Sequence, residues 1–553
     1  MGASSQESRS AIKEESFSRA NSWLRFLAPA VAFIGVAVAL QVAGGAYHAE
    51  FARDPDEPGH VVSGIAVARY MQTALFRPPL PFFRDYYEHY PKVALGNWPP
   101  ALYVAEGIAI IVVKHQRYAL LLLQALCAGL VAWLVFRQTC RLVGNAAAAL
   151  GGTCLLCTTT MQVNGSMVMA EVPLVLAMFA ACLAFARYAE TGRARDAFLF
   201  AVLMSAAVLT KGTGWALAAI PLAVAAATRN WRMLLRRNLW LAGVIVAALC
   251  VPWYYFTLRI ASHSFGGKIG LAYTKVAVVE FTREFFTLPG AAIAVAGVAG
   301  IIVTVLLGHK LGRTRAYWAS LAGLIAGVWL MLVTVPAAIN NRYLLSVVPP
   351  IFVMAAAAAR QLGNWRAPGP RHALRAGVIF GGLALATLVL SLPPRSKQPH
   401  GFIPVASTLD MVIGNERTAL IVSDAIGEGA LISEFAMREP EAKVYLLRGS
   451  KLLASQGWNG ENYRARVHSG DECWRLLESV PVAFLIMDRR RSVVHRDHFD
   501  AVEAMLRDHN GDWTLVKAFP DPQDAAYSIA LYRLTSGAQP MRKLPGWILP
   551  SLH

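Results

Sequence analysis

The chain has 553 residues, of which 56% are hydrophobic and only 16% are charged. This composition leaves too little polar surface for a water-soluble globule, so lipid must surround much of the protein. The formal net charge of +18 would suit a nucleic-acid-binding protein, but the basic residues lie in loops between apolar segments, and this placement argues against nucleic acid as a partner.

The chain begins with a polar segment of mixed charge, and its first apolar segment starts near Leu27. No clear small-residue cleavage site follows that segment. We therefore expect residues 1–26 to form a cytoplasmic tail and the first span to be retained in the membrane.

Apolar windows of about 20 residues, the length that a membrane-spanning helix needs, recur through residues 27–392. They predict an α-helical polytopic membrane protein with about eleven transmembrane helices, at 27–46, 118–136, 145–162, 172–187, 197–210, 213–228, 239–257, 289–307, 317–336, 344–359 and 376–392.

The loops between these windows predict the orientation, because cytoplasmic loops collect Lys and Arg. One alternate set of loops is rich in basic residues: Arg137 and Arg141; Arg187, Arg193 and Arg195; Arg229, Arg232, Arg236 and Arg237; Lys310, Arg313 and Arg315; and Arg360, Arg366, Arg371 and Arg375. An odd number of spans that starts on the cytoplasmic side places residues 393–553 on the extracytoplasmic side. We expect a multi-pass protein of the cell inner membrane with a cytoplasmic N-terminus.

Residues 47–117 form a segment that is too long for a simple turn and is rich in aromatic residues and prolines. This composition suits helices that lie in the plane of the membrane interface, followed by a short apolar helix at 100–113. The basic loops indicate that this short helix does not cross the membrane; if it did, the orientation of everything after it would invert. We expect 47–117 to be a large first extracytoplasmic loop.

Beyond residue 393 the pattern changes to short apolar runs separated by helical segments. The strand-like runs are TALIVSD, KVYLLRG, VAFLIMD, WTLVKAF and YSIALYRL, and the helical segments include GEGALISEFAMRE and HFDAVEAMLRDH. We expect residues 393–553 to form a soluble α/β domain. Asp424 and Asp488 follow two of the strands, where α/β folds often bind ligands, although capping and loop acids are the commoner case.

The sequence predicts no metal site. Its seven cysteines are spread along the chain, and the CxxC of Cys154 and Cys157 lies in an apolar segment without a nearby His or second CxxC. We expect these two cysteines to be small buried helix residues.

The most distinctive polar phrase is DPDEPGH at 54–60, directly after the first apolar window. Considered alone, it is an ordinary polar loop in which an acid caps a helix that begins near Pro58. A second phrase in the same loop is NWPPALY at 97–103, with Lys92 shortly before it.

Three later phrases carry isolated polar residues beside apolar windows: MVMAEVPL at 167–174, LTKG at 209–212 and NRYLL at 341–345. Glu171 is either a functional acid or an acid just outside the membrane. Lys211 either extends outward to the interface or meets a phosphate. Arg342 offers a bidentate donor for phosphate and Tyr343 a hydroxyl at interface depth, or both belong to the interfacial belt.

In their order and spacing these phrases resemble the GT-C class of integral-membrane glycosyltransferases, over roughly residues 25–390. The branch they resemble contains the protein O-mannosyltransferases and the lipid A aminoarabinose transferases, a glycosyltransferase family 39-like group. Two departures stand out: Trp98 occupies the place of the family's His or Lys before the proline pair, and Glu171 stands where many relatives have Asp. Lys92 lies near enough in sequence to replace the missing cation.

The resemblance implies a GT-C fold and transfer of a sugar, with inversion, from a polyprenyl-phosphate donor to a protein, lipid or cell-envelope glycan acceptor on the extracytoplasmic face. It implies that Asp56 is the base and that Glu57 and Glu171 orient donor or acceptor. The remaining implied substrate-binding residues are His60, Lys92, Asn97, Lys211, Arg342 and Tyr343. No cofactor is implied beyond the lipid-linked sugar itself, and a divalent cation stays possible.

Two other classes of function agree less well with the sequence. A transporter would place charged residues at the middle of the membrane and often has inverted repeats, whereas no repeat is visible here and the candidate residues gather at one face. A membrane-anchored ligand sensor would not need eleven spans.

Overall fold

The computed structural model describes residues 27–536 apart from 265–269, 308–310, 337, 366–371, 415–416 and 459. The predicted cytoplasmic tail, residues 1–26, lies outside the described residues, and so do Lys310, Arg366 and Arg371 of the basic loops.

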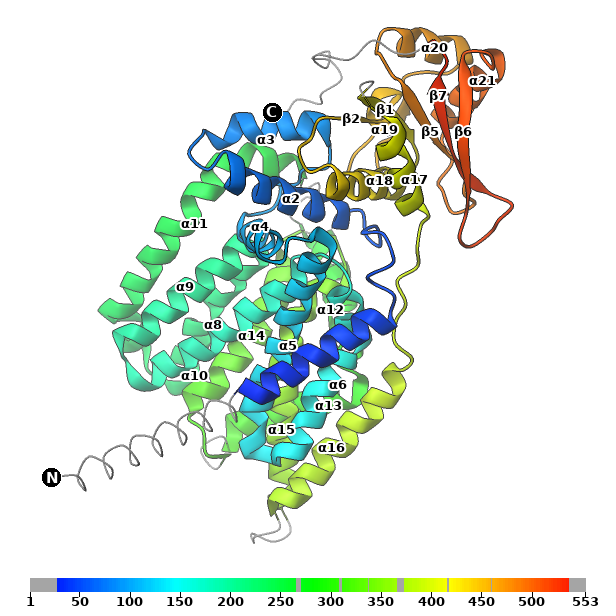
Figure 1. Ribbon diagram of the computed structural model, residues 1–553. Helices are drawn as coiled ribbons and strands as arrows, with labels where there is room; N and C mark the ends of the chain where they lie inside the picture. Colours follow the sequence, from blue (N-terminus) through cyan, green and yellow to red (C-terminus); the bar gives the residue numbers. More distant parts are fainter. Residues whose placement is uncertain are drawn as a thin grey trace, which may run out of the picture.

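Most of the helices from Leu27 to Ser391 form one bundle, with a mixed α/β domain at its upper end in Figure 1. Six described helices are long and apolar enough to cross a membrane: α5 (Gln116–Val143), α8 (Glu171–Thr191), α11 (Arg237–Leu258 of Arg237–Ser264), α14 (Arg315–Thr334), η4 with α15 (Asn341–Asn364) and α16 (His372–Ser391). Two bent pairs raise the number of candidate spans to as many as eight: α6 (Asn145–Cys157) with α7 (Thr159–Gly165), and α12 (Leu271–Thr287) with α13 (Ala291–Leu307).

All eleven predicted windows contain helix, but the prediction of eleven separate spans exceeds these six to eight candidates. The remaining three windows correspond to helices of at most 17 residues: Leu27–Ala43, α9 (Ala194–Thr210), and η1 (Gly212–Ala218) with α10 (Ala219–Thr228). At about 1.5 Å per residue such a helix is roughly 25 Å long, against a hydrocarbon core of about 30 Å. A hydropathy window measures composition and does not detect where the backbone breaks.

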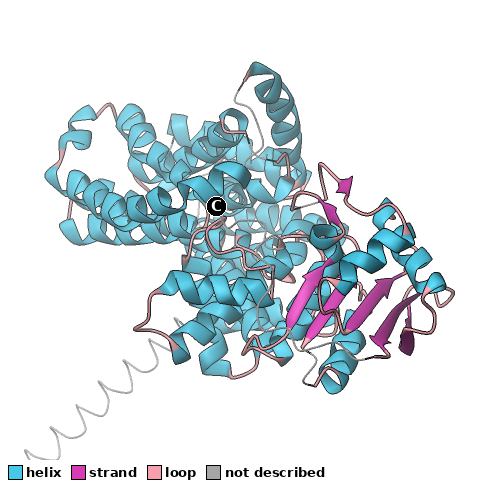
Figure 2. Ribbon diagram, turned by 90° about the horizontal axis from the view of Figure 1, so that it is seen from above, coloured by secondary structure: helices cyan, strands magenta, loops and turns pink. Residues whose placement is uncertain are grey.

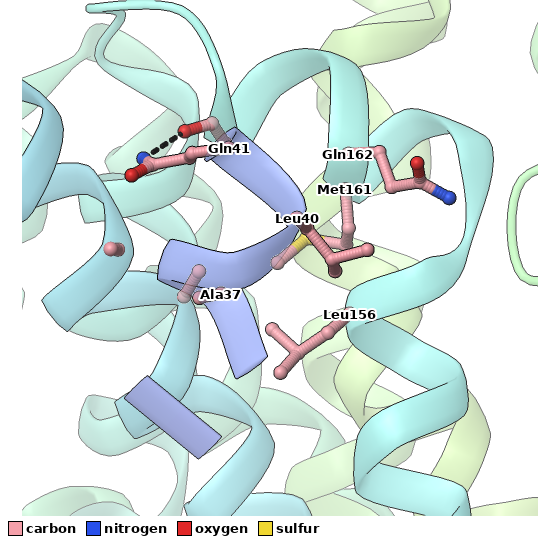
Figure 3. A pocket seen from close by; sticks show the side chains of 9 residues that line it. Ala37, Leu40, Gln41, Leu156, Met161 and Gln162 are labelled. Atoms are coloured by element: carbon pink, nitrogen blue, oxygen red, sulfur yellow. Dashed lines mark hydrogen bonds between the residues drawn. The ribbon is translucent and has the colours of Figure 1, made fainter. Parts of the chain in front are cut away.

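Gln41 joins the first of these short helices to the bundle. Its side-chain amide donates hydrogen bonds to the backbone oxygens of Leu121 (2.9 Å) and Gly165 (2.7 Å). A cavity of about 20 Å³ lies beside it, lined in part by Leu40, Met161 and Leu156 (Figure 3). A cavity of this size holds about one water molecule.

Three helices of the first loop lie above the bundle in Figure 1, beside the α/β domain: α2 (Glu57–Thr73), α3 (Pro79–His89) and α4 (Ala101–Val113). The predicted short apolar helix at 100–113 is α4, and its 13 residues extend only about 20 Å. It packs closely on α2, because a Cβ at Gly64 would lie 2.6 Å from Glu106 Oε2. A side chain at Gly64 would therefore force the two helices apart.

The C-terminal region contains a five-stranded sheet in the order β2-β1-β5-β7-β6, in which β1, β2 and β5 are parallel and β7 and β6 antiparallel. All five predicted strands are present: β1 (Thr418–Val422), β2 (Tyr445–Arg448), β5 (Phe484–Asp488), β6 (Trp513–Pro520) and β7 (Ser528–Leu534). Figure 2 shows the sheet with helices beside it. These are α17 (Phe402–Val412), α18 (Ala425–Arg438), α20 (Gly470–Glu478) and α21 (Asp497–Asp508).

Alternate strand residues face two different cores, as the period of two requires. Leu420 and Leu485 belong to a core with α20 and α21, whereas Ile421 and Ile486 belong to a core that also contains Val62 of α2 and residues of α3. One face of the sheet, with α18, is thus packed against the first loop. The α/β domain and the first loop therefore share one of these two cores.

The two acids that follow strands act within the domain. Asp424 caps α18, since its Oδ1 accepts hydrogen bonds from the N–H groups of Ile426 and Gly427. Asp488 is buried and accepts from Ser423 and Arg490. Both contacts agree with the commoner structural interpretation.

Candidate active site

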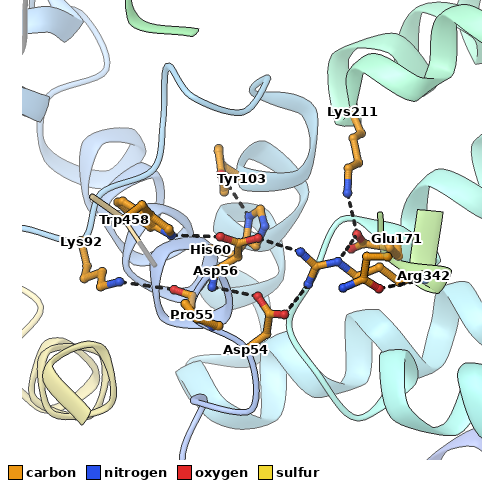
Figure 4. A network of polar contacts seen from close by, with 11 residues as sticks. Asp54, Pro55, Asp56, His60, Lys92, Tyr103, Glu171, Lys211, Arg342 and Trp458 are labelled. Carbon is orange, nitrogen blue, oxygen red and sulfur yellow. Dashed lines mark hydrogen bonds and ion pairs between the residues drawn. The ribbon is translucent and has the colours of Figure 1, made fainter. Parts of the chain in front are cut away.

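The DPDEPGH phrase forms the turn that leads into α2. Asp56 occupies the position before the helix and Pro58 is in its first turn, but the Asp56 side chain makes no capping hydrogen bond. Asp54 Oδ1 instead accepts from the Asp56 N–H at 3.0 Å. The capping role considered from sequence alone is therefore not the role of the Asp56 carboxylate, which points into a polar network (Figure 4).

The guanidinium of Arg342 lies at the centre of this network. It comes from η4 (Asn341–Val347), where Asn340 Oδ1 accepts from the Arg342 N–H and fixes the start of the turn. Arg342 Nη2 donates to Asp56 Oδ2 at 2.8 Å, and Nη1 lies 2.7 Å from Asp54 Oδ2. Its Nε lies 3.3 Å from Glu171 Oε1. One buried cation thus gathers three carboxylates from two distant parts of the chain.

Lys211 extends the network from the break between α9 and η1. Its Nζ donates to Glu171 Oε1 at 2.5 Å and lies 4.2 Å from the centre of the Tyr343 ring. Glu171, the first residue of α8, is only 2% exposed, and its other oxygen has no hydrogen-bond partner within the described part of the chain. Glu171, Lys211, Arg342 and Tyr343 were all predicted site residues, and the fold brings them together.

His60 belongs to an aromatic group beside the network. Its Nδ1 lies 3.0 Å from the Tyr103 hydroxyl, and its ring centre is 5.2 Å from that of Trp98. Burial lowers the pKa of His60 to about 3, so the imidazole is neutral near pH 7. His60 can therefore exchange hydrogen bonds in the site but does not supply a positive charge.

Lys92 lies on the other side of Asp56. Its Nζ donates to the Pro55 oxygen at 3.3 Å and lies 4.1 Å from the ring centre of Trp458. Burial lowers the pKa of Lys92 well below its usual value. Asn97 lies in the turn before α4, where its N–H donates to the Ala94 oxygen.

Glu57, which directly follows Asp56, has different partners. Its carboxylate binds Lys397 Nζ at 2.5 Å, the N–H of Val168 at 3.1 Å and the N–H of Arg53 at 2.9 Å. Both charged side chains of the pair are at most 1% exposed. Glu57 thus ties the first loop to the segment that leads from α16 into the α/β domain.

No group of three or more His, Cys, Asp or Glu side chains that could hold a metal ion occurs among the described residues. The three carboxylates of the network surround the Arg342 guanidinium instead.

The segment 97–256 matches the family model described as dolichyl-phosphate-mannose-protein mannosyltransferase. This segment contains Glu171 and Lys211 of the network. Over this segment the chain is similar to that family, and the chain is a membrane glycosyltransferase. No curated protein sequence matches it.

Solved structures place the glycosyltransferase in the GT-C fold class. ArnT from Cupriavidus metallidurans, bound to undecaprenyl phosphate, is 15% identical with a TM-score of 0.54, and the match covers 92% of this chain and 99% of ArnT. The oligosaccharyltransferase AglB from Archaeoglobus fulgidus is 12% identical with a TM-score of 0.52, over 84% of this chain and 70% of AglB. The mycobacterial arabinofuranosyltransferase AftD is 14% identical with a TM-score of 0.52, over 94% of this chain and 40% of AftD. At such identities the likeness is one of fold.

The glycosyltransferase site combines the carboxylate of Asp56, in a partly buried turn, with two cations that carboxylates already neutralise. Asp56 accepts from Arg342 at one oxygen and from the Trp458 indole N–H at the other, at 2.9 Å. The carboxylates of Asp54, Asp56 and Glu171 mean that neither Arg342 nor Lys211 is a buried cation without a partner, which would be costly. A phosphate that enters must share the two cations with these carboxylates.

Three residues of the glycosyltransferase site were missed by the sequence reasoning: Asp54, Lys397 and Trp458. Asp54 lies in the DPDEPGH phrase, and its position two residues before Asp56 could have indicated that the two carboxylates lie close together. Lys397 and Trp458 follow the last apolar window, in the region where no family motif was recognised. No local pattern marks either residue as a partner of a turn more than 300 positions earlier.

Proposed function

We propose that this glycosyltransferase transfers a sugar, with inversion, from a polyprenyl-phosphate donor to a protein, lipid or glycan acceptor on the extracytoplasmic face of the inner membrane. The observation that carries the proposal is the direct contact between Asp56 and Arg342, in a network that Glu171 extends to Lys211. A carboxylate base beside clustered cations is what transfer from a phosphate requires. The donor class is supported by the relatives, since ArnT and AglB have structures with undecaprenyl phosphate and a dolichol-phosphate.

In the proposed reaction an acceptor hydroxyl or amine attacks the anomeric carbon of the donor sugar. The acceptor proton passes to Asp56, and the bond between the anomeric carbon and the phosphate oxygen breaks with its electron pair on that oxygen. The polyprenyl phosphate leaves with the negative charge, which Arg342 and Lys211 stabilise. One displacement of this kind inverts the anomeric centre.

The other predicted residues have supporting roles in this scheme. Glu171 orients Lys211 and Arg342 through its shared oxygen, and Tyr343 lies against the Lys211 ammonium. His60, Lys92 and Asn97 lie on or before the helices next to Asp56 and are proposed to contact the substrates. Glu57 is proposed to act by holding the turn in place, because its carboxylate is committed to Lys397 and two backbone N–H groups.

The test is Asp56→Asn in the purified full chain, with Asp85→Asn as the matched control. Asp85 is an exposed acid in α3 of the same loop. A panel of undecaprenyl-phosphate sugars, with a hexose and a pentose among them, serves as donor, and release of undecaprenyl phosphate is measured. Loss of a general base typically lowers the rate by about 100-fold to 10,000-fold. We expect such a loss in Asp56→Asn and a parent rate in Asp85→Asn; a parent rate in both variants would remove Asp56 as the base.

The sugar and the acceptor are found by a separate measurement. Mass spectrometry of lipid-linked sugars and envelope glycans in a deletion strain should show one donor that accumulates and one glycan that is lost. Re-expression of the parent chain, but not of Asp56→Asn, should restore that glycan.

A further inference from the structure

Trp458 brings the α/β domain into contact with the proposed base. It lies in the loop between β3 (Ala454–Ser455) and β4 (Arg464–Ala465), 402 positions after Asp56. Its indole Nε1–H donates to Asp56 Oδ1 at 2.9 Å (Figure 4). Within the described part of the chain, this hydrogen bond joins the α/β domain directly to the proposed base.

The loop that carries Trp458 is held by its own domain. The Gly457 N–H donates to the Glu461 oxygen at 2.7 Å, and Lys451 Nζ donates to the Gln456 oxygen at 2.5 Å. The strands on either side pair at Ala454 with Ala465. These bonds on both sides of Trp458 fix the direction in which its side chain leaves the domain.

The surface that receives Trp458 fits the indole closely. Lys92 Nζ lies 4.1 Å from the centre of the indole ring, and the Trp98 ring centre is 6.0 Å away. A Cβ at Gly59 would lie 3.0 Å from Trp458 Cζ2, so the absence of a side chain there makes room for the indole. Residues of the first loop and of the α/β domain therefore both shape this contact.

The indole completes a two-sided support for the Asp56 carboxylate. Arg342 binds Oδ2 from the bundle and Trp458 binds Oδ1 from the α/β domain. Two donors on different oxygens fix the rotation of the carboxylate plane, and each oxygen keeps a lone pair that can accept the proton of a substrate. Because the indole is a neutral donor, it orients the carboxylate without adding a second cation.

We propose that Trp458 is a positioning residue for Asp56, and that the α/β domain is thereby part of the active site. The proposal rests on the proposed function of Asp56 as the base. It gives the C-terminal domain a role in the reaction that no motif in its sequence indicates.

The test uses the full chain and the donor panel described above. Trp458→Phe keeps an aromatic ring against Lys92 but removes the N–H donor, together with part of the indole's volume. Loss of one hydrogen bond to a charged group predicts a fall in kcat of about 10-fold to 100-fold. KM for the donor should stay within about twofold, and the acidic limb of the rate profile should move to higher pH, since a carboxylate that loses a donor holds a proton more tightly.

Two further variants separate positioning from packing. Trp458→His restores an N–H donor on a smaller ring and should recover part of the lost kcat. Trp513→Phe is the matched control, because Trp513 is a buried indole of the same domain whose N–H has no hydrogen-bond partner among the described residues. That variant should keep the parent kcat and the parent pH profile.

The outcomes are distinct. A parent kcat and pH profile in Trp458→Phe, with Asp56→Asn inactive, overturns the role of Trp458 and leaves the proposed function standing. Equal losses in Trp458→Phe and Trp458→His, with no movement of the acidic limb, also overturn it in favour of packing. If Asp56→Asn keeps the parent rate, the proposed base fails first, and the role of Trp458 fails with it.

Discussion

The buried pair of Glu57 and Lys397 predicts a stability effect that distinguishes an anchoring role from a catalytic one. The two side chains are 0% and 1% exposed, and their charged atoms are 2.5 Å apart. Glu57→Gln removes the negative charge and leaves an ammonium buried without its partner, which costs about 3–5 kcal/mol. The amide also cannot accept all the bonds that Glu57 accepts from Lys397, Val168 and Arg53.

The assay is thermal unfolding of the detergent-solubilised full chain, followed by tryptophan fluorescence. Glu57→Gln and Lys397→Met should each lower Tm clearly, whereas the double variant should lose much less than the sum of the two, because residues in contact are coupled. Glu441→Gln, in the exposed ion pair with Lys443, is the control and should leave Tm unchanged.

Two results would refute this reasoning. One is an additive double variant, which would mean that the two side chains do not stabilise each other. The other is a Glu57→Gln protein that unfolds at the parent Tm but has lost turnover, since a residue that only orients substrates would behave in this way.

Three further predictions concern the donor, the orientation and pH. Lys211→Ala and Arg342→Ala should each weaken undecaprenyl phosphate binding, measured as Kd, by about 10-fold to 100-fold, since a charge-assisted contact contributes about 1.5–3 kcal/mol; a parent Kd in both variants would exclude them from the phosphate site. In intact cells, a membrane-impermeant thiol reagent should label Ser479→Cys, in the α/β domain, and not Arg232→Cys; the reverse pattern would invert the predicted orientation. The pKa of His60 is about 3 in the folded chain and near 6.5 when unfolded, so the unfolded chain binds more protons between these values and stability falls as pH decreases below about 6.5. Lowering the pH from about 7.5 to 5 should therefore reduce the free energy of unfolding of the parent by about 2 kcal/mol through His60. His60→Gln lacks this contribution, so its Tm should fall less over the same pH range.

Local patterns in the sequence predicted most of the secondary structure of both regions. The five strands of the α/β domain were predicted from short apolar runs such as TALIV, in which alternate residues face different cores. The helical windows were predicted from composition, because burial in lipid or protein requires apolar residues along the whole helix. Composition did not predict the number of spans, because the breaks at Thr158 and near Gly290 lie within apolar sequence.

The candidate site divides in the same way. The sequence by itself determined that Asp56, Glu171, Lys211 and Arg342 are charged residues beside apolar windows, where an unpaired charge is costly and a role or a partner is required. Only the tertiary structure decided the partners. Arg342 reaches Asp56 across 286 positions, and Glu57, next to Asp56, turns instead to Lys397 across 340 positions. A local pattern shows that a charge needs a partner, but which opposite charge approaches it depends on how the helices and the α/β domain pack.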